Sequence, residues 1–123
     1  MATYRARFFH DWSAGWLWAA NDETRRVYGY EIDHHAIGLS GSLAEELDRL
    51  AAWHDSSLNQ TDPDHPSLWR QPECAAFNAD VRAALVRLAS ELGDSWELVE
   101  EFPDLAEDRD LDRYLEDPVG FVL

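Results

Sequence analysis

Residues 72–100 read PECAAFNADVRAALVRLASELGDSWELVE, and this stretch decides the fold class because a helical pattern gives way to a strand pattern within it. Apolar side chains recur at helical spacing before Gly93, which follows where a helix is expected to stop. Pro72 suits the first turn of that helix, because the amide that it lacks would be unpaired there anyway. The apolar face consists of Phe77, Val81, Leu85, Leu88 and Leu92. Residues 96–100, which Pro103 closes, predict a strand.

The N-terminal residues predict a β-hairpin. Residues 3–12 alternate apolar and basic side chains at their start, as a half-buried strand does, and residues 16–20 predict a second strand after a short turn. A first long helix is expected to begin after Ser42, because Ser42 and Glu45 have the spacing of a capping box. A long connector, residues 55–71, separates this helix from the next one, and its own apolar side chains are available to hold it down.

These elements, with a short helix before Pro118, predict one α+β domain over residues 1–123. The expected architecture is a small antiparallel sheet, made of the N-terminal hairpin and the late strand, with two main helices packed on one face. A chain of 123 residues is long enough to bury most of its apolar surface as a single domain.

The chain is strongly acidic. It has 14 Asp and 11 Glu against 10 Arg and no Lys, which gives a formal net charge of −15. Nucleic-acid backbones and anionic membranes both require a basic face, so neither is an expected partner. A basic protein is the expected partner, or the charge serves solubility alone. Cys74 is the only cysteine, and no signal-like apolar segment starts the chain, so we expect a cytoplasmic protein without a disulfide, metal or cofactor.

The negative charge is concentrated near the C-terminal end. Residues 94–117 contain 11 acidic residues and two arginines, so this segment carries −9 and the other 99 residues carry −6. We predict that the segment contacts a basic protein, with carboxylates that steer association and aromatic side chains that anchor it. The predicted contacts are Trp96, Glu97, Glu100, Glu101, Phe102, Asp104, Glu107, Asp108, Asp110, Asp112 and Tyr114. The alternative is a solvated strand edge and helix face without a partner.

An incomplete calcium-loop pattern lies within that segment. Asp108, Asp110 and Asp112 resemble the first ligands of such a loop, but Arg113 and Val119 occupy the positions of its glycine and its final glutamate. The pattern therefore predicts no calcium site.

The histidines form no recognised catalytic or metal-binding spacing. His10 and His54 are each followed by an aspartate, and His34 and His35 are adjacent. A carboxylate can orient an imidazole as a general base, but neighbours in sequence point in different directions, so adjacency is not pairing. No two histidines have the spacing that puts two zinc ligands on one helical face. We predict no catalytic residue and no metal ligand.

Six tryptophans are more than so small a core is expected to need. Trp16 and Trp18 share one face of the predicted second strand. That face either displays aromatic rings to a partner or is covered by the rest of the fold, and the sequence leaves both open.

Several short motifs follow one another in a characteristic order. They are His10-Asp11-Trp12, Leu17-Trp18, Tyr28-Gly29-Tyr30, Leu39-Ser40, Trp53-x-Asp55-x-Ser57-Leu58-Asn59, Pro63-x-x-Pro66-x-x-Trp69, Phe77-Asn78 and Glu91-Leu92-Gly93. In these motifs the chain resembles a group of small, acidic, uncharacterised actinobacterial proteins, over most of residues 9–99. The resemblance implies an ordered connector and no particular activity. By size, charge and lack of catalytic motifs, the chain also resembles toxin-neutralising immunity proteins.

The leading hypothesis is therefore a non-enzymatic protein that captures and neutralises a basic partner, as an immunity protein or antitoxin does with a toxin such as a nuclease. Its carboxylates would take the places of phosphates. One alternative is a small hydrolase-like enzyme, which requires His10, His54 or His65 to converge with acids in one pocket. The other is a structural module that self-associates through the hairpin or through the apolar tail, residues 119–123.

Overall fold

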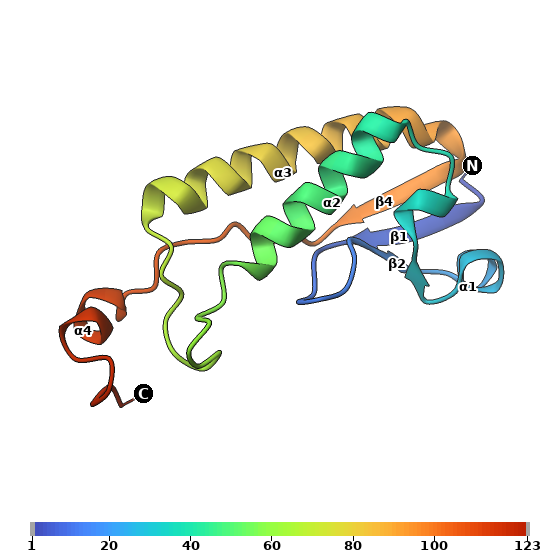
Figure 1. The fold of residues 1–123 in the computed structure, drawn as a ribbon. Helices are drawn as coiled ribbons and strands as arrows, with labels where there is room; N and C mark the ends of the chain where they lie inside the picture. Colours follow the sequence, from blue (N-terminus) through green and yellow to red (C-terminus); the bar gives the residue numbers. More distant parts are fainter. Residues whose placement is uncertain (1, 123) are drawn as a thin grey trace.

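A computed structural model describes residues 2–122 and shows a four-stranded sheet with two long helices across one face (Figure 1). The strands are β1 (Tyr4–Phe8), β2 (Leu17–Ala19), β3 (Glu31–Ile32) and β4 (Trp96–Glu100), in the spatial order β3-β2-β1-β4. The pairs β1–β2 and β2–β3 are antiparallel, and β4 runs parallel to β1. The α+β class and its mostly antiparallel sheet are confirmed. β4 can pair in parallel because the long helices return the chain across the sheet before it begins.

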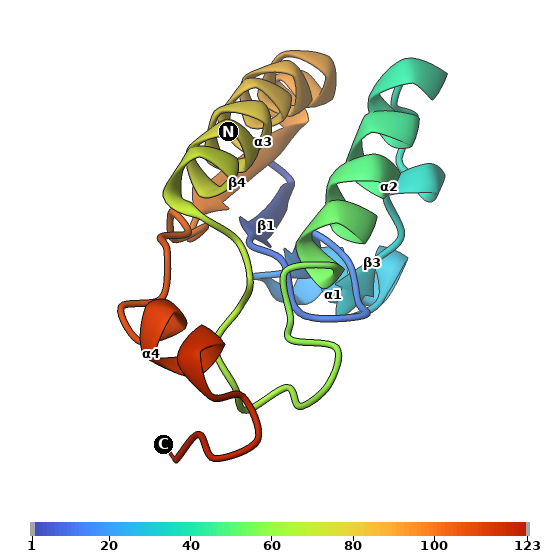
Figure 2. The same ribbon diagram turned by 60° about the vertical axis from the view of Figure 1, so that its left-hand side comes forward.

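The helices α2 (Gly41–Asp55) and α3 (Gln71–Leu92) lie beside each other over the same face (Figures 1 and 2). The alternation in β1 explains which face they cover, because Ala6 and Phe8 are fully buried while Arg5 and Arg7 keep exposed side chains. The main core side chains are Phe8, Trp16, Leu17, Leu43, Leu47, Leu50, Phe77, Val81 and Leu88. Within residues 2–122, no helix has the length and apolar character needed to cross a membrane.

The start of α2 differs from the prediction. Ser40 is the N-cap residue, and its Oγ accepts a hydrogen bond from the Leu43 amide at 3.3 Å. Glu91 of α3 accepts hydrogen bonds from the amide and hydroxyl of Ser40, at 2.7 and 2.8 Å. The predicted capping box of Ser42 and Glu45 is therefore wrong, because a carboxylate from the neighbouring helix takes the capping role.

The ends of α3 and the late strand match the sequence pattern. A proline occupies the first turn of α3, and Gly93 ends the helix with a φ of +68°, a conformation that favours glycine. β4 covers the residues that the pattern predicts, 96–100. The short helices are α1 (Asp22–Tyr28), capped by Asn21, and α4 (Leu111–Glu116), near the C-terminal end.

The connector between α2 and α3 is held by its own side chains. Asn59 is buried, and its side chain donates to the Pro66 carbonyl at 3.0 Å and accepts from the Thr61 amide at 3.0 Å. Trp69 is buried in the core, whereas Leu68 is exposed. The connector is thus ordered by a buried amide as much as by apolar packing.

Two tryptophans of the N-terminal hairpin, Trp16 and Trp18, are covered. Trp16 is fully buried, and its Nε1 donates to the Leu47 carbonyl at 3.0 Å. Trp18 lies on the other face of the sheet, stacked on Phe9 and flanked by Tyr30. The prediction that Trp16 and Trp18 share one face is therefore wrong, because β2 begins only at Leu17 and Trp16 lies outside its alternation. The hairpin therefore does not display an open aromatic face, and both rings stabilise the fold.

Candidate partner-binding surface and histidine clusters

The acidic segment, residues 94–117, follows β4 at the edge of the sheet and then continues to α4 (Figure 1). Seven of its eight predicted acidic contacts have an arginine nitrogen within 4.0 Å. They are Glu97, Glu100, Glu101, Asp104, Glu107, Asp110 and Asp112. The eighth, Asp108, accepts a hydrogen bond from the Asp110 amide at 2.8 Å. The fold thus pairs most of these acids with arginines.

Two arginines each hold two carboxylates of the segment. Arg82 on α3 places Nη1 2.7 Å from Glu100 and Nη2 2.9 Å from Asp104. Arg70 places Nη1 2.8 Å from Asp112 and 3.7 Å from Glu107. Hydrogen bonding to the carboxylates raises the pKa of both guanidinium groups. The carboxylates are held in place, and part of their charge is neutralised.

The arginines of β1 pair with the segment across the sheet face that α2 and α3 leave uncovered. Arg5 Nε lies 3.4 Å from Glu97, in the strand register that places these residues opposite each other. Arg7 donates two hydrogen bonds to Glu101, at 2.8 and 2.7 Å, and these bonds lower the pKa of the Glu101 carboxyl group. Two arginine–glutamate contacts therefore lie on the outer face beside the β1–β4 pair, one within it and one just after β4 ends.

The three predicted aromatic anchors occupy different environments. Phe102 and Tyr114 are buried, with 4% and 5% exposure. Trp96 is half-buried, and its ring packs against Tyr4 and Tyr28 at centroid distances of 4.9 and 5.4 Å. Of the three rings, Trp96 presents the most surface.

Two His-Asp motifs that are distant in sequence meet in the fold. His10 Nε2 lies 3.1 Å from Asp55 Oδ1, and His54 Nδ1 lies 3.8 Å from the same oxygen. Burial, followed by the nearby His10, lowers the pKa of His54 to about 4. Asp55 also accepts a hydrogen bond from the Ser13 amide at 3.1 Å, so this cluster fastens the β1–β2 loop to the end of α2. His65 lies outside it, beside an acid of its own connector.

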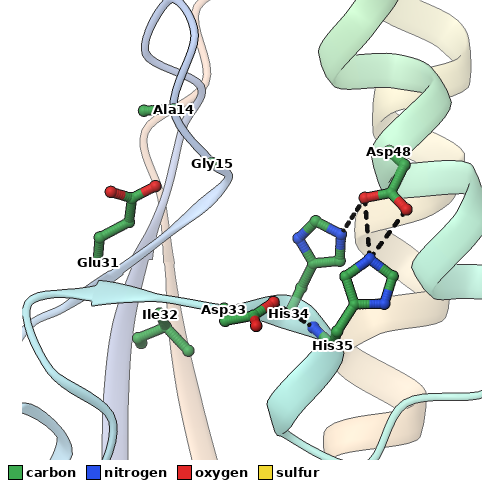
Figure 3. Close-up of a pocket in the computed structure, with 8 residues that line it drawn as sticks. All are labelled: Ala14, Gly15, Glu31, Ile32, Asp33, His34, His35 and Asp48. Carbon is green, nitrogen blue, oxygen red and sulfur yellow. Dashed lines mark hydrogen bonds and ion pairs between the residues drawn. The ribbon is translucent and has the colours of Figure 1, made fainter.

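A second histidine cluster lies at the edge of a pocket. It joins the short 3-10 helix η1 (His34–Ala36) to Asp48 of α2: His34 Nε2 is 2.7 Å from Oδ1, and His35 Nε2 is 2.9 Å from Oδ2. Burial alone would raise the pKa of Asp48, but hydrogen bonds from both imidazoles outweigh burial and lower it. The pocket has a volume of about 310 Å³ and is also lined by Glu31 and Asp33 (Figure 3).

Two exposed aromatic residues are neighbours in sequence of residues that line this pocket. Trp12 and Tyr30 have 53% and 54% exposure, and they lie close in sequence to the pocket residues Ala14 and Glu31. The sequence pattern predicts no role for either residue, although both belong to the short motifs that carry the resemblance. Burial, which sequence does not report, separates these two rings from the covered tryptophans.

The comparisons with known proteins identify the class of protein. A family model described as Serratia CdiI immunity protein-like matches residues 5–100, and a search of curated proteins gave no match. Because the matched residues make up most of the chain, the protein belongs to this immunity protein-like family, which confirms the resemblance to immunity proteins. The match includes β2, β3, β4, all of β1 but its first residue, and both histidine clusters, and it ends where the acidic segment leaves β4.

Proposed function

We propose that this chain neutralises a toxin in the cytoplasm by binding a basic toxin domain, such as that of a nuclease, and that it acts without catalysis. Family membership supports a toxin as the partner, and the net charge of −15 supports a basic one. A nuclease attracts phosphates with a cationic surface, which carboxylates complement. The observation that carries the proposal is the row of exposed carboxylates that arginines hold in place along residues 97–112.

Carboxylates that are already paired can still contact a partner. Each has two oxygens with several acceptor positions, so one arginine does not exhaust it. The side chains of Asp104 and Asp112 remain 63% and 81% exposed beside their arginines. Trp96 is the proposed anchor, while the buried Phe102 and Tyr114 fix the backbone from which neighbouring acids project.

The same charge makes other partners unsuitable. Nucleic-acid backbones and anionic membranes would be repelled by a surface that is acidic in excess. Under this proposal the chain inhibits by covering the cationic surface of the toxin, and it requires no cofactor for that.

The test uses, as the candidate toxin, the protein encoded next to this chain in its native genome. Its association rate is measured by stopped-flow fluorescence at several salt concentrations, with wild type and with the triple variant Asp108→Lys, Asp110→Lys, Asp112→Lys. We expect association to slow by about tenfold and to depend less on salt, because steering by this surface is removed. The matched control replaces three exposed acids elsewhere, Asp22, Glu45 and Asp64, with lysine.

The two triple variants change the net charge equally, so their difference isolates position. Equal slowing by both would mean that total charge steers the toxin and that the acidic segment is not the contact. An unchanged rate in both would contradict an electrostatic capture of any kind. Failure of the neighbouring protein to bind wild type at all would overturn the proposed function itself.

A further inference from the structure

The cluster of His34, His35 and Asp48 is built from two elements that are fixed independently of it. Asp33 caps the 3-10 helix η1, where its carboxylate accepts a hydrogen bond from the His35 amide at 2.9 Å. Asp48 follows directly on Leu47, which is fully buried in the core. The three side chains therefore converge because the fold brings their backbones together, as Figure 3 shows.

The donor atoms of the cluster point at one position. Both Nε2 atoms face the Asp48 carboxylate, at 2.7 Å for His34 and at 2.9 and 3.1 Å for His35. The ligand atoms all lie within 4.8 Å of one another. Two ligands on a tetrahedral zinc ion lie about 3.3 Å apart, since zinc–nitrogen and zinc–oxygen bonds are about 2.0–2.2 Å long. The nitrogen–oxygen distances in the cluster, 2.7–3.1 Å, are slightly shorter than this, so the carboxylate would move back from the imidazoles to admit the ion.

The surroundings suit a divalent cation. Glu31 and Asp33 line the same pocket, and none of the eight residues that line it is an arginine. The pocket gives access from solvent, and it leaves space on the open side of the cluster for a further ligand such as water. Two imidazoles favour zinc over calcium or magnesium, which prefer sets of oxygen ligands.

We propose that His34 Nε2, His35 Nε2 and the Asp48 carboxylate bind a zinc ion, with solvent from the pocket as the fourth ligand. The site goes beyond toxin binding and does not depend on it. The spacing of the histidines predicts no metal ligand, because adjacent histidines do not share a helical face. The structure adds the third ligand from α2, 13 residues further along the chain than His35.

The other histidine cluster is the internal comparison. His10, His54 and Asp55 also bring three ligand atoms within 4.8 Å, but the His10 side chain has no exposure and the cluster lies outside the pocket lining. An ion would have to displace packed side chains to reach it. We therefore assign zinc to the cluster at the pocket.

Zinc chloride titrated into the chelator-treated, dialysed full-length chain tests the site by calorimetry. We expect one equivalent to bind, with protons competing for the imidazoles so that affinity falls in acid. His35→Ala and Asp48→Asn should each weaken binding by about tenfold or more. Both side chains are about half exposed, so the variants are expected to fold, and circular dichroism checks that they do. His54→Ala is the matched control and should retain the affinity of wild type.

Three results would overturn the assignment. The first is that wild type takes up no zinc with a saturable heat. The second is that His54→Ala abolishes uptake while His35→Ala preserves it, which would move the ion to the buried cluster. Equal affinity in wild type, His35→Ala and Asp48→Asn would show zinc bound elsewhere on the acidic surface.

Discussion

The acidic segment and the two histidine clusters, His10–His54–Asp55 and His34–His35–Asp48, use carboxylates in different ways. In residues 94–117, most of the predicted contact acids face an arginine from another part of the chain. In the histidine clusters, Asp48 and Asp55 face histidines. Arginine is charged at every physiological pH, whereas histidine carries charge only when it is protonated. The segment with the greatest charge density in sequence is thus the more neutralised of the two in the fold.

This difference matters for locating a binding surface. A count of acids along the chain measures charge density, but a partner meets the charge that remains after internal pairing. In the acidic segment, arginine contacts reduce that charge and fix the positions of the carboxylates. The segment would therefore contribute to binding mainly by holding its carboxylates where a partner can contact them. In the two histidine clusters the remaining charge depends on pH and on any bound cation.

We expect the largest effect from removing Trp16, the core side chain that supports the cluster of His10, His54 and Asp55. Trp16 is fully buried, stacks on Phe8 and lies 4.7 Å from the His10 ring by centroid distance. Trp16→Ala should lower the free energy of unfolding by about 3–5 kcal/mol, because it leaves a large cavity and removes a buried hydrogen bond. Urea denaturation measures this, with Trp12→Ala as control. Trp12 is 53% exposed, and its removal should change stability little.

A loss of similar size in both variants would contradict the burial that separates the two tryptophans. It would mean that the exposed ring supports the fold as much as the buried one does. The position of the His10, His54 and Asp55 cluster would then depend on the β1–β2 loop and not on the core.

The second prediction separates the two regions by pH. His54 has a pKa of about 4 in the fold, below its ordinary value of 6.5, so the unfolded chain binds the proton first. Stability should therefore be full above about pH 6.5 and fall towards pH 4, by about 2–3 kcal/mol in total. The groups that face His54 are His10, Asp55 and Asp11. Urea midpoints measured between pH 7.5 and pH 5 should show this slope, and His54→Gln should flatten it.

The acidic segment should respond in a different window. The pKa of Glu101 is lowered by hydrogen bonds from Arg7, so its stabilising pair is lost only as the pH falls below the ordinary carboxyl value. A slope between pH 6.5 and pH 5 that persists in His54→Gln would show that another group controls this range. The pH dependence of stability in this range would then not come from His54.

Much of the fold follows from local sequence, and the missed features depend on distant residues. β4 and the ends of α3 were predicted because period, proline and glycine signals are all local. The cap of α2 was missed because Glu91 lies 51 residues from Ser40. The parallel pairing of β4 was missed because strand direction depends on how the helices cross the sheet.

The candidate sites show the same division. The acidic segment was found by counting, but its arginine partners lie up to 94 residues away, as Arg7 does from Glu101. The His10 and Asp55 contact spans 45 residues, so adjacency in sequence gave only half of each cluster. Burial of Phe102 and Tyr114, which decides whether a ring can anchor a partner, also had no local signal.

The smallest expected effect tests how much the arginine pairs contribute. Arg82 contacts Glu100 and Asp104, donates to the Phe102 carbonyl and lies over the Phe102 ring at 5.3 Å. Arg82→Met should lower the free energy of unfolding by about 1 kcal/mol, because exposed ion pairs contribute little individually. The control is Arg109→Met, since within residues 2–122 no carboxylate lies within 4.0 Å of Arg109.

The same variant also tests whether pairing with arginine limits the negative charge that a partner meets. Removing Arg82 frees two carboxylates without adding an acid, so a basic toxin should associate about twofold faster if the acidic segment is the contact. Arg109→Met changes the net charge by the same amount and serves as the control for total charge. If both variants speed association equally, internal pairing does not limit the charge that the partner meets. A faster rate in Arg82→Met alone would show that pairing with Arg82 reduces the negative charge available to the partner.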